Sequence, residues 1–445
     1  MSVEALAGLR RRLAALLAEA PPAVGGFRHA VRDLVVVGSS SRGGSSIFAE
    51  TLRQSPAMVH LRAEVNPFLV LHGLGYPQSG AGSDALGAEA AQDPANLDAL
   101  GADLARDAGC PTDALATRGE VGQFAVDLAV RLSMQWPGEV FATRELRGHV
   151  DALVAAGQGV RDGRLVDVDR FHARLLSRLR ADHPAINPYY YDLHPGRIAE
   201  ACPGAPPAEG PPGPLVVEEP PFVCIRPWTR AGADALSSCP LVIKTPSNAY
   251  RLPFLAALFP RARVRLLHLT RNVAAAVNGL YDGWRYPGFF SHPLPVPLAI
   301  RGYSDRFPGH GSQWWKFDLP PGWAAFSAAP LEQVCAFQWR SAHEALLHAP
   351  VPAGDYLRLR FEDVVGPASR REVVAGTLGA WLGTGDDPAL RAALLGGLPP
   401  VMATAAPRQR RWFERASQLE PVLRDPRNRQ TMERLGYDPD PSTWT

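Results

Sequence analysis

A loop rich in glycine and serine, set between a strand and a helix, is the segment of this sequence with the clearest chemistry. Residues 35–46 read V-V-V-G-S-S-S-R-G-G-S-S, and the β-branched run before the first glycine predicts a strand over 34–37. A helix is expected to follow at about 47–54. In this arrangement the backbone amides of the loop and of the helix N-terminus can surround an anion such as a phosphate.

The position of the positive charge in this loop bears on which phosphate compound it binds. Gly38 and Gly43 have the G-x-x-x-x-G spacing of an ATP-binding P-loop, but Gly44 stands where that loop has its lysine. A kinase without this lysine lacks its main contact with the β- and γ-phosphates. The segment most like a metal-binding acidic strand end, residues 165–169, is short. An ATP-dependent P-loop kinase and a non-catalytic nucleotide-binding module remain alternatives.

Arg42 and its neighbours resemble the 5′-phosphosulfate loop of the sulfotransferase family that uses 3′-phosphoadenosine 5′-phosphosulfate (PAPS). That loop has a Lys or Arg, a small residue, a Gly and two Ser or Thr. The resemblance implies that Arg42 contacts the phosphosulfate and stabilises charge on the bridging oxygen as the bond to sulfur breaks. It implies no metal ion. The cofactor-binding residues of the loop are then Ser41, Arg42, Gly43, Gly44, Ser45 and Ser46.

A second segment resembles the 3′-phosphate half of the same cofactor site. Residues 266–278 read L-L-H-L-T-R-N-V-A-A-A-V-N, which predicts the end of a strand, a junction at Arg271 and then a helix. Arg271 matches the family's 3′-phosphate arginine, and a guanidinium at a helix start suits a phosphate dianion. Asn278 stands where the family commonly has a serine, and we expect it to donate a hydrogen bond instead.

An arginine cluster near the C-terminus is similar to the family's basic segment that covers the 3′-phosphate and the adenine. Residues 407–412 read P-R-Q-R-R-W, and Arg408, Arg410 and Arg411 are the candidates. As a bare cluster of charges, the segment is equally typical of a solvated surface. Taken together, the motifs imply a PAPS-dependent sulfotransferase whose product is adenosine 3′,5′-bisphosphate.

Sulfuryl transfer to a hydroxyl or an amine also requires a base, because the acceptor loses a proton as the new bond forms. Members of the family carry a His or Glu after the first helix, and the matching segment here is H-L-R-A-E-V-N-P-F at 60–68. Glu64 is the first candidate for the base and His72 the second. Lys244 lies in I-K-T-P, which is similar to a segment of carbohydrate-type sulfotransferases whose lysine lies near the transferring sulfate. Lys244 is therefore a further catalytic candidate.

The acceptor pocket is expected to come from aromatic segments elsewhere in the chain. The candidate walls are residues 189–191, 218–222, 284–290 and 314–315. Such walls suit a lipid-like, a polyketide or a glycosidic acceptor equally well. Taken singly, each of these residues is more typical of core packing.

These motifs require a fold that brings distant segments together. Apolar runs at 34–37, 58–61, 241–244, 264–269 and 356–360 predict strands, and helices are expected between and after them. This alternation predicts an α/β fold of three layers, with a mostly parallel central sheet between helices. We expect one domain over residues 1–445. Its parts are an N-terminal helix within 1–30, a large helical insertion on the acceptor side at 76–235, and an aromatic loop at 284–323.

Composition limits the class of protein. With 46% apolar residues and a net charge of +2, the chain can bury a core but has no global basic field for nucleic acid. Its five cysteines include no C-x-x-C pair, which argues against a zinc site and favours a reducing, cytoplasmic setting. No stretch approaches the ~20 apolar residues of a membrane-spanning helix. Lysine occurs only at Lys244 and Lys316, a usage typical of a GC-rich, bacterial genome.

Overall fold

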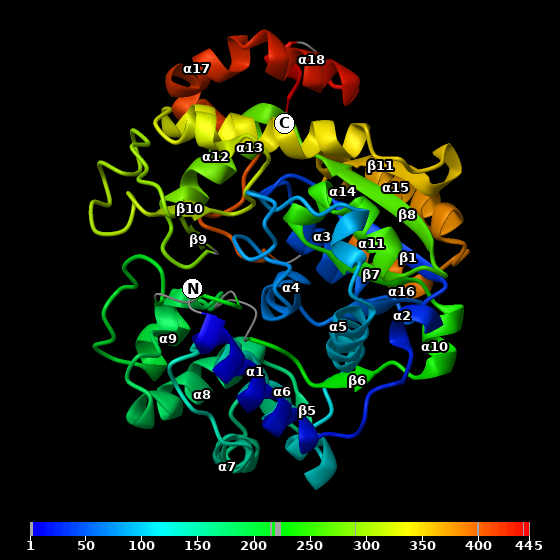
Figure 1. Ribbon diagram of the computed structural model, residues 1–445, viewed down its shortest axis with the longest axis vertical. Coiled ribbons are helices and arrows are strands. Elements are labelled where there is room, and N and C mark those ends of the chain that lie inside the picture. Colours follow the sequence, from blue (N-terminus) through cyan, green and yellow to red (C-terminus); the bar gives the residue numbers. More distant parts are fainter. Residues whose placement is uncertain are drawn as a thin grey trace.

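The computed structural model describes residues 3–213, 216–218, 224–289, 291–397, 400–438 and 440–444. At its centre lies a seven-stranded sheet with the strand order β11-β8-β1-β7-β2-β3-β6 (Figure 1). The five strands from β11 to β2 run parallel, whereas β3 pairs antiparallel with both β2 and β6. The strands are β1 (Asp33–Gly38), β2 (Val59–Leu61), β3 (Ala108–Pro111), β6 (Trp228–Arg230), β7 (Leu241–Lys244), β8 (Arg263–Thr270) and β11 (Tyr356–Arg360).

The central strand β1 is apolar on both faces, as a strand in the middle of a three-layer fold must be. Leu34 and Val36 point into one core, which they share with helices on that side of the sheet. Val35 and Val37 alternate with them and point into a second core. The predicted α/β fold is therefore confirmed (Figure 1). The first core contains α5 (Pro94–Asp107), α11 (Leu252–Leu258) and α13 (Leu331–Leu347), and the second contains α3 (Ser45–Leu52), α15 (Ala368–Leu382) and α16 (Pro388–Gly396).

The segment predicted as a helical insertion is largely helical, but it also supplies the two antiparallel strands at one end of the sheet, β3 and β6. β3 and β6 are four and three residues long and lack the apolar run by which a buried strand is recognised. Gly109 lies so close to the neighbouring strand that a Cβ would come within 2.1 Å of the Thr229 carbonyl. The insertion helices enclose a core of their own, in the lower half of Figure 1. They are α6 (Arg118–Gln135), α7 (Thr143–Ala155), α8 (Val168–Asp182) and α9 (Pro195–Ala201), beside the short hairpin β4 (Val160–Arg161) and β5 (Arg164–Leu165).

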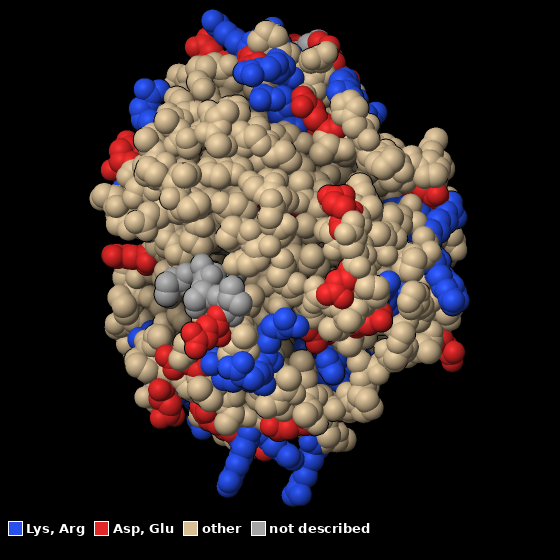
Figure 2. All heavy atoms as spheres, in the orientation of Figure 1, with Lys and Arg blue, Asp and Glu red and all other residues tan. Residues whose placement is uncertain are grey.

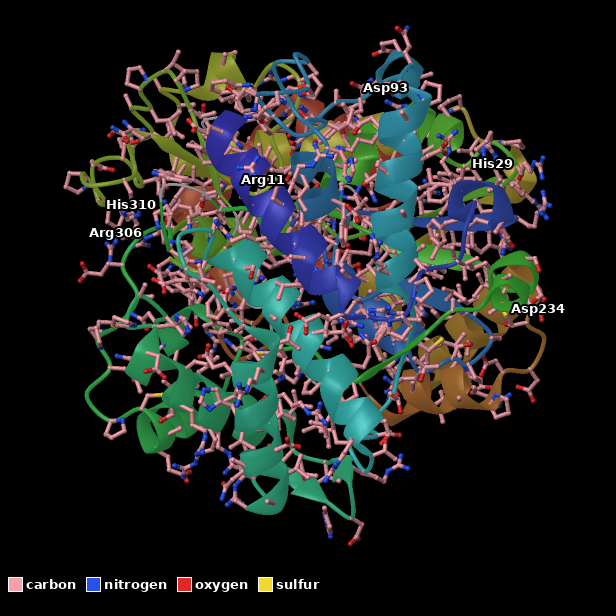
Figure 3. All side chains as sticks on the ribbon, turned by 60° about the horizontal axis from the view of Figure 1, so that its bottom comes forward. Arg11, His29, Asp93, Asp234, Arg306 and His310 are labelled. Atoms are coloured by element: carbon pink, nitrogen blue, oxygen red, sulfur yellow. The ribbon has the colours of Figure 1, made fainter. Side chains whose placement is uncertain are left out.

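The N-terminal helix α1 (Val3–Ala18) lies beside α6, with Arg11 on its outer side (Figure 3). Leu9 is fully buried in a cluster with Val70 of α4 (Asn66–Leu71) and Met134 of α6. Through this contact, α1 joins α6 of the insertion to α4, the helix that follows β2. None of the described helices has the length and apolar character needed to cross a membrane. The remaining short helices of this half are α2 (Phe27–Ala30) and α10 (Ala233–Ser238).

The aromatic segment 284–323 is largely irregular, and several of its aromatic side chains pack in a core. It contains an antiparallel hairpin of β9 (Ser291–Pro293) and β10 (Trp314–Lys316). Trp284, Trp315 and Trp339 have no exposed surface and pack in one cluster. This cluster lies at the top of Figure 1 and is closed by the C-terminal helices. The helices concerned are α12 (Val273–Trp284), α17 (Ala416–Arg424) and α18 (Pro426–Arg434), and α14 (Phe361–Val364) follows β11.

The strand order puts the loop after β1 at the middle of the sheet's carboxyl edge. From β1 the chain passes through α3 to β2, two positions away, and β7 later fills the gap. β8 then pairs with the other side of β1, so Val36 lies between Ile243 and Leu266. In open α/β sheets, ligand sites form where the strand order reverses in this way.

On the visible face of the molecule (Figure 2), charges of both signs are distributed rather than gathered in one patch. On the face drawn in Figure 2, Lys and Arg side chains are interspersed with Asp and Glu, and a broad uncharged area lies between them. Any strong positive potential on this face must therefore come from a local group of residues.

Candidate active site

A cavity of about 470 Å³ opens at the carboxyl edge of the sheet. Its lining includes a residue at or just after each of the five parallel strands. Ser45 follows β1, Glu64 follows β2, Lys244 ends β7, Arg271 follows β8 and Phe361 follows β11. The structure thus brings predicted site residues together in one cavity, although some of them lie more than two hundred positions apart in the chain.

The glycine-rich loop has the conformation that an anion site requires. Gly44 has a φ of +93°, and a Cβ there would lie 2.3 Å from the Phe361 ring. At Gly43 a Cβ would lie 2.2 Å from the Ser39 hydroxyl, although Gly43 itself does not line the cavity. Helix α3 begins at Ser45, and no side chain caps its first turn. The first amides of a helix have no partner within it, so they are available to a ligand.

Arg42 is held in the cavity by a segment from the far end of the chain. Its Nη1 donates to the Met402 carbonyl at 2.8 Å, and its Nη2 lies 3.4 Å from the Thr404 hydroxyl. The guanidinium also lies 4.9 Å from the Phe289 ring centroid. Its Nε is buried and has no hydrogen-bond partner among the described residues. Burial, reinforced by the charge of Arg271, lowers the pKa of Arg42 to about 10.

Arg271 lies directly beside the loop. Its Nη1 donates to the Arg42 carbonyl at 3.0 Å, and its guanidinium lies 5.1 Å from the Phe361 ring centroid. Burial lowers the pKa of Arg271, partly offset by Glu362. Two buried guanidiniums that disfavour each other's charge make a strongly anion-seeking pair, because a bound anion would relieve both the burial cost and the repulsion.

Glu64 and Lys244 form an ion pair on the opposite side of the loop. Lys244 Nζ lies 2.5 Å from Glu64 Oε1 and 3.0 Å from the Ser46 hydroxyl. Both charged side chains are nearly buried, with 8% and 10% of their surface exposed. The lysine therefore connects the candidate base to the first turn of α3.

The C-terminal arginines Arg408, Arg410 and Arg411 line the cavity, and Arg411 shares Asp282 with Arg415. Arg411 pairs with Asp282 at 2.6 Å, and Arg415 donates to the side-chain oxygens of both Asp282 and Asn278 at 2.5 Å. Asn278 therefore accepts with its oxygen, and its amide group is the remaining donor. Arg410 donates to the Ser442 carbonyl at 2.9 Å, and Arg408 forms an exposed ion pair with Glu414. All four predicted residues (Asn278, Arg408, Arg410 and Arg411) line the cavity.

His72 does not line the cavity. It ends α4, with Nδ1 2.9 Å from the Asn96 side-chain oxygen and Nε2 2.9 Å from an Asp103 oxygen. Both ring nitrogens are therefore engaged with α5. In this geometry Glu64 is the better placed of the two candidates for the base.

The predicted aromatic walls are mostly core residues. Trp284 and Trp315 are fully buried in the aromatic cluster, Tyr191 hydrogen-bonds Gln135 inside the insertion, and Glu218 pairs with Arg131. Residues 219–222 and Phe290 lie outside the described residues. The aromatic side chains that do line the cavity include Phe289, Phe317, Phe361 and Trp412.

Asp318 is a cavity residue that no motif in the sequence predicted. Its Oδ1 accepts from the Ser41 hydroxyl at 2.6 Å, and its Oδ2 accepts from the Tyr250 hydroxyl at 3.0 Å. Burial raises the pKa of Asp318 to about 6. The Ser41 hydroxyl therefore donates to Asp318, and its backbone amide remains the group that can donate to a phosphate. No motif surrounds Asp318, because only the packing of the aromatic segment brings it to the loop.

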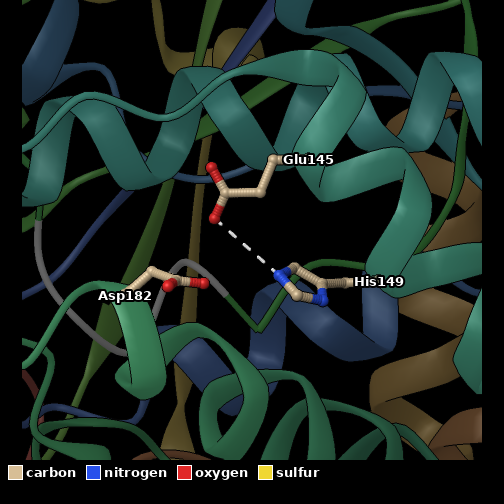
Figure 4. Close-up of side chains that lie close together, drawn as sticks. All are labelled: Glu145, His149 and Asp182. Carbon is tan, nitrogen blue, oxygen red and sulfur yellow. Dashed lines mark ion pairs between the residues drawn. The ribbon is translucent and has the colours of Figure 1, made fainter.

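A group that could hold a metal ion occurs elsewhere in the described part of the chain, in the insertion. Glu145 and His149 of α7 lie beside Asp182 at the end of α8 (Figure 4). Glu145 also contacts His183, at 3.2 Å, and none of the three residues lines the cavity.

The acidic segment considered for a kinase metal site lies in the insertion as well. Asp167 accepts a hydrogen bond from the Arg170 amide and so caps the N-terminus of α8. Leu165 lies in the hairpin β4–β5 rather than in the central sheet. No acidic strand end of the kinase type is therefore contributed by residues 165–169.

Comparisons with known proteins give distant structural likenesses. No family model and no curated protein matches the sequence. A sulfotransferase domain from the curacin biosynthetic pathway is 10% identical, with a TM-score of 0.35, over 92% of this chain and 99% of that one. The sulfotransferase domain of the Synechococcus PCC 7002 olefin synthase is 13% identical, with a TM-score of 0.36, over 92% and 96%. The sulfotransferase STF9 from Mycobacterium avium is 14% identical, with a TM-score of 0.36, over 98% and 84%. Because the identities are at most 14% and the TM-scores at most 0.36, these likenesses do not establish a function, which we infer from the cavity instead.

Proposed function

We propose that the protein is a sulfotransferase that moves the sulfuryl group of PAPS to a hydroxyl or an amine of an acceptor. The observation that carries this proposal is the pair of buried arginines, Arg42 and Arg271, beside the uncapped start of α3. One guanidinium would bind the phosphosulfate and the other the 3′-phosphate. The buried, unpartnered Nε of Arg42 fits an anion, since buried donors are almost always satisfied in native proteins.

When bound, PAPS supplies a sulfuryl group on a good leaving group. The amides of Gly43 and Gly44 and the start of α3 would hold its 5′-phosphate. Arg42 and Lys244 would stabilise the negative charge that develops on the bridging oxygen. That oxygen keeps the electron pair of the broken sulfur–oxygen bond, so the leaving product is adenosine 3′,5′-bisphosphate. Arg42 would exchange its present contact with the Met402 carbonyl for the ligand.

Glu64 would take the proton of the acceptor as the new bond to sulfur forms. The carboxylate lies against Lys244, so the proton acceptor and the charge stabiliser act from one ion pair. Arg271 would select the 3′-phosphate, with Asn278 and Arg411 nearby on the same side of the cavity. None of these roles requires a metal ion.

Calorimetric titration with adenosine 3′,5′-bisphosphate, ADP and magnesium ATP tests the proposal. We expect tight binding of the bisphosphate, and a loss of about 10- to 100-fold in Arg271→Ala, since a buried charge-assisted contact is removed. Arg306→Ala is the matched control, because Arg306 is exposed at the outer edge of the molecule (Figure 3). Binding of magnesium ATP with no effect of the 3′-phosphate would overturn the sulfotransferase and favour a kinase. Bisphosphate binding without transfer from labelled PAPS to any acceptor of a broad panel would favour a non-catalytic module.

A further inference from the structure

Asp318 is a buried carboxyl group on the cavity wall that the transfer step does not use. It has 2% of its surface exposed, and it follows Phe317, whose φ of +64° is rare for a residue with a side chain. The backbone here is fixed, because Gln338 donates to the carbonyls of Lys316 and Asp318 at 2.8 Å. Strained conformations that the surrounding structure holds in place cluster at functional sites.

The carboxyl group of Asp318 retains acceptor capacity toward the cavity. Ser41 donates to one oxygen and Tyr250 to the other. A carboxylate has about four lone-pair sites, so two donors leave room for a third. Asp318 lines the same cavity as Glu64 and Asn66. A ligand that reaches the candidate base can therefore meet a second carboxyl group.

The charged groups around Asp318 are otherwise paired with one another. Arg251 lies 3.1 Å from an Asp84 oxygen, His292 lies 3.6 Å from the other, and Lys244 is paired with Glu64. Across the described chain, Asp318 takes part in no ion pair, which accords with its raised pKa. The carboxyl group that forms no ion pair among the described residues is also the one that can receive a donor from a ligand.

We propose that Asp318 recognises the acceptor, by accepting a hydrogen bond from a hydroxyl group adjacent to the one that receives the sulfuryl group. The acceptor is then polyhydroxylated rather than lipid-like. A hydroxyl fits better than an ammonium, because Arg42, Arg271 and Lys244 would repel a cationic acceptor. The other polar groups at this end, Asn66 and Ser247, suit such a ligand as well. This inference rests on the proposed function.

The test uses two pairs of probes that differ by one hydroxyl: catechol with phenol, and cyclohexane-1,2-diol with cyclohexanol. Their affinities for the bisphosphate-bound protein are measured by ligand-observed NMR, and their kcat and KM with labelled PAPS. The variants are Asp318→Asn, which keeps the shape and one acceptor oxygen, and Asp318→Ala. Asp305→Asn is the matched control, because Asp305 is an exposed carboxylate in the same aromatic segment. Bisphosphate binding is measured first in every variant.

We expect the wild type to favour each diol over its partner by about 10- to 100-fold, as one hydrogen bond to a charged group allows. In both Asp318 variants that ratio should fall toward one through KM, while Asp305→Asn keeps it. A ratio near one in the wild type, an unchanged ratio in the variants, or no binding of either diol overturns the inference. An equal loss of kcat on all probes with a shifted pH profile also overturns it, since Asp318 would then be the base. Failure of the bisphosphate to bind the wild type is a separate result, which refutes the proposed function itself.

Discussion

At the scale of single residues, the ion pair of Glu64 and Lys244 is the part of the site on which the proposed chemistry depends most. Lys244 contacts both Glu64 and the Ser46 hydroxyl, so it lies between the proton acceptor and the phosphate loop. Removing the carboxylate would take away the negative charge that is paired with this nearly buried ammonium group. A test of Glu64 must therefore keep its shape and its hydrogen bond to the lysine.

Glu64→Gln meets that condition, because the amide oxygen can still accept from Lys244. We expect kcat to fall by about 10²- to 10⁴-fold, the usual contribution of a general base. The affinity for adenosine 3′,5′-bisphosphate should change by less than about threefold, since no phosphate contact is lost. Steady-state kinetics and calorimetry measure the two effects, with the exposed Glu433→Gln as control. An unchanged kcat would remove Glu64 from the mechanism.

The sequence motifs identified the candidate site residues that lie within a local pattern. They did not identify Asp318, which lies in no motif. Arg42 and Arg271 each follow a strand that is recognisable as an apolar run, so their places at the sheet edge could be predicted. Asp318 comes to the cavity only because the tryptophans of its segment pack into the core. His72 shows the converse, since a histidine close to the motif in sequence points to α5 instead.

At the scale of elements, the five parallel strands could be predicted and the two antiparallel strands could not. β7 has the predicted bounds, because its continuous apolar run marks a strand covered by helices on both sides. β11 has them too, although it is an edge strand in which arginine alternates with leucine. β3 and β6 lack such an apolar run, and they pair with each other beside the insertion. The insertion was predicted only as a helical segment over 76–235, and its helices form a core among themselves.

The phosphate loop is the element whose conformation most restricts its sequence. In Gly44→Ala, a side chain would face a φ of +93° and the Phe361 ring at 2.3 Å. We expect a destabilisation of about 1–3 kcal/mol and loss of bisphosphate binding, because both the strain and the displaced ring act on the loop. Gly122→Ala is the matched control. Gly122 lies inside α6 with no atom within 4 Å of the added Cβ, so alanine should stabilise the helix by about 0.5–1 kcal/mol. Urea unfolding and calorimetry would contradict this account if the two variants behaved alike.

At the scale of the whole molecule, several histidines are buried in the neutral form and link folding to pH. Burial lowers the pKa of His60 to about 3, of His172 to about 4 and of His343 to about 3. In the unfolded chain each titrates near 6.5. Below that pH the unfolded state binds more protons than the folded state. The stability from each histidine is therefore fully present above pH 6.5 and is lost as the pH falls toward the folded-state pKa.

Buried carboxyls act in the opposite direction, so a single pH curve does not isolate the histidines. Burial raises the pKa of Asp318 to about 6 and of Glu218 to about 7. Folding then favours their protonated forms, and the contribution of each to stability grows as the pH falls. The histidine effect has to be measured as a difference between two proteins that share these carboxyls.

His172→Gln provides that difference, because glutamine can still donate to the Ile225 carbonyl that His172 Nε2 now contacts at 2.8 Å. The difference in free energy of unfolding between the variant and the wild type should shift by about 2 kcal/mol in favour of the variant between pH 7.5 and pH 5. The reason is that residue 172 of the variant takes up no proton on unfolding. Urea unfolding at pH 7.5, 6 and 5 measures the change. In the control His29→Gln, where the histidine is exposed (Figure 3), the free energy of unfolding should differ from that of the wild type by the same amount at all three pH values. If the difference for His172→Gln were constant as well, the histidine would be charged or hydrated in the folded protein, and the insertion core around it would be less dry than its packing implies.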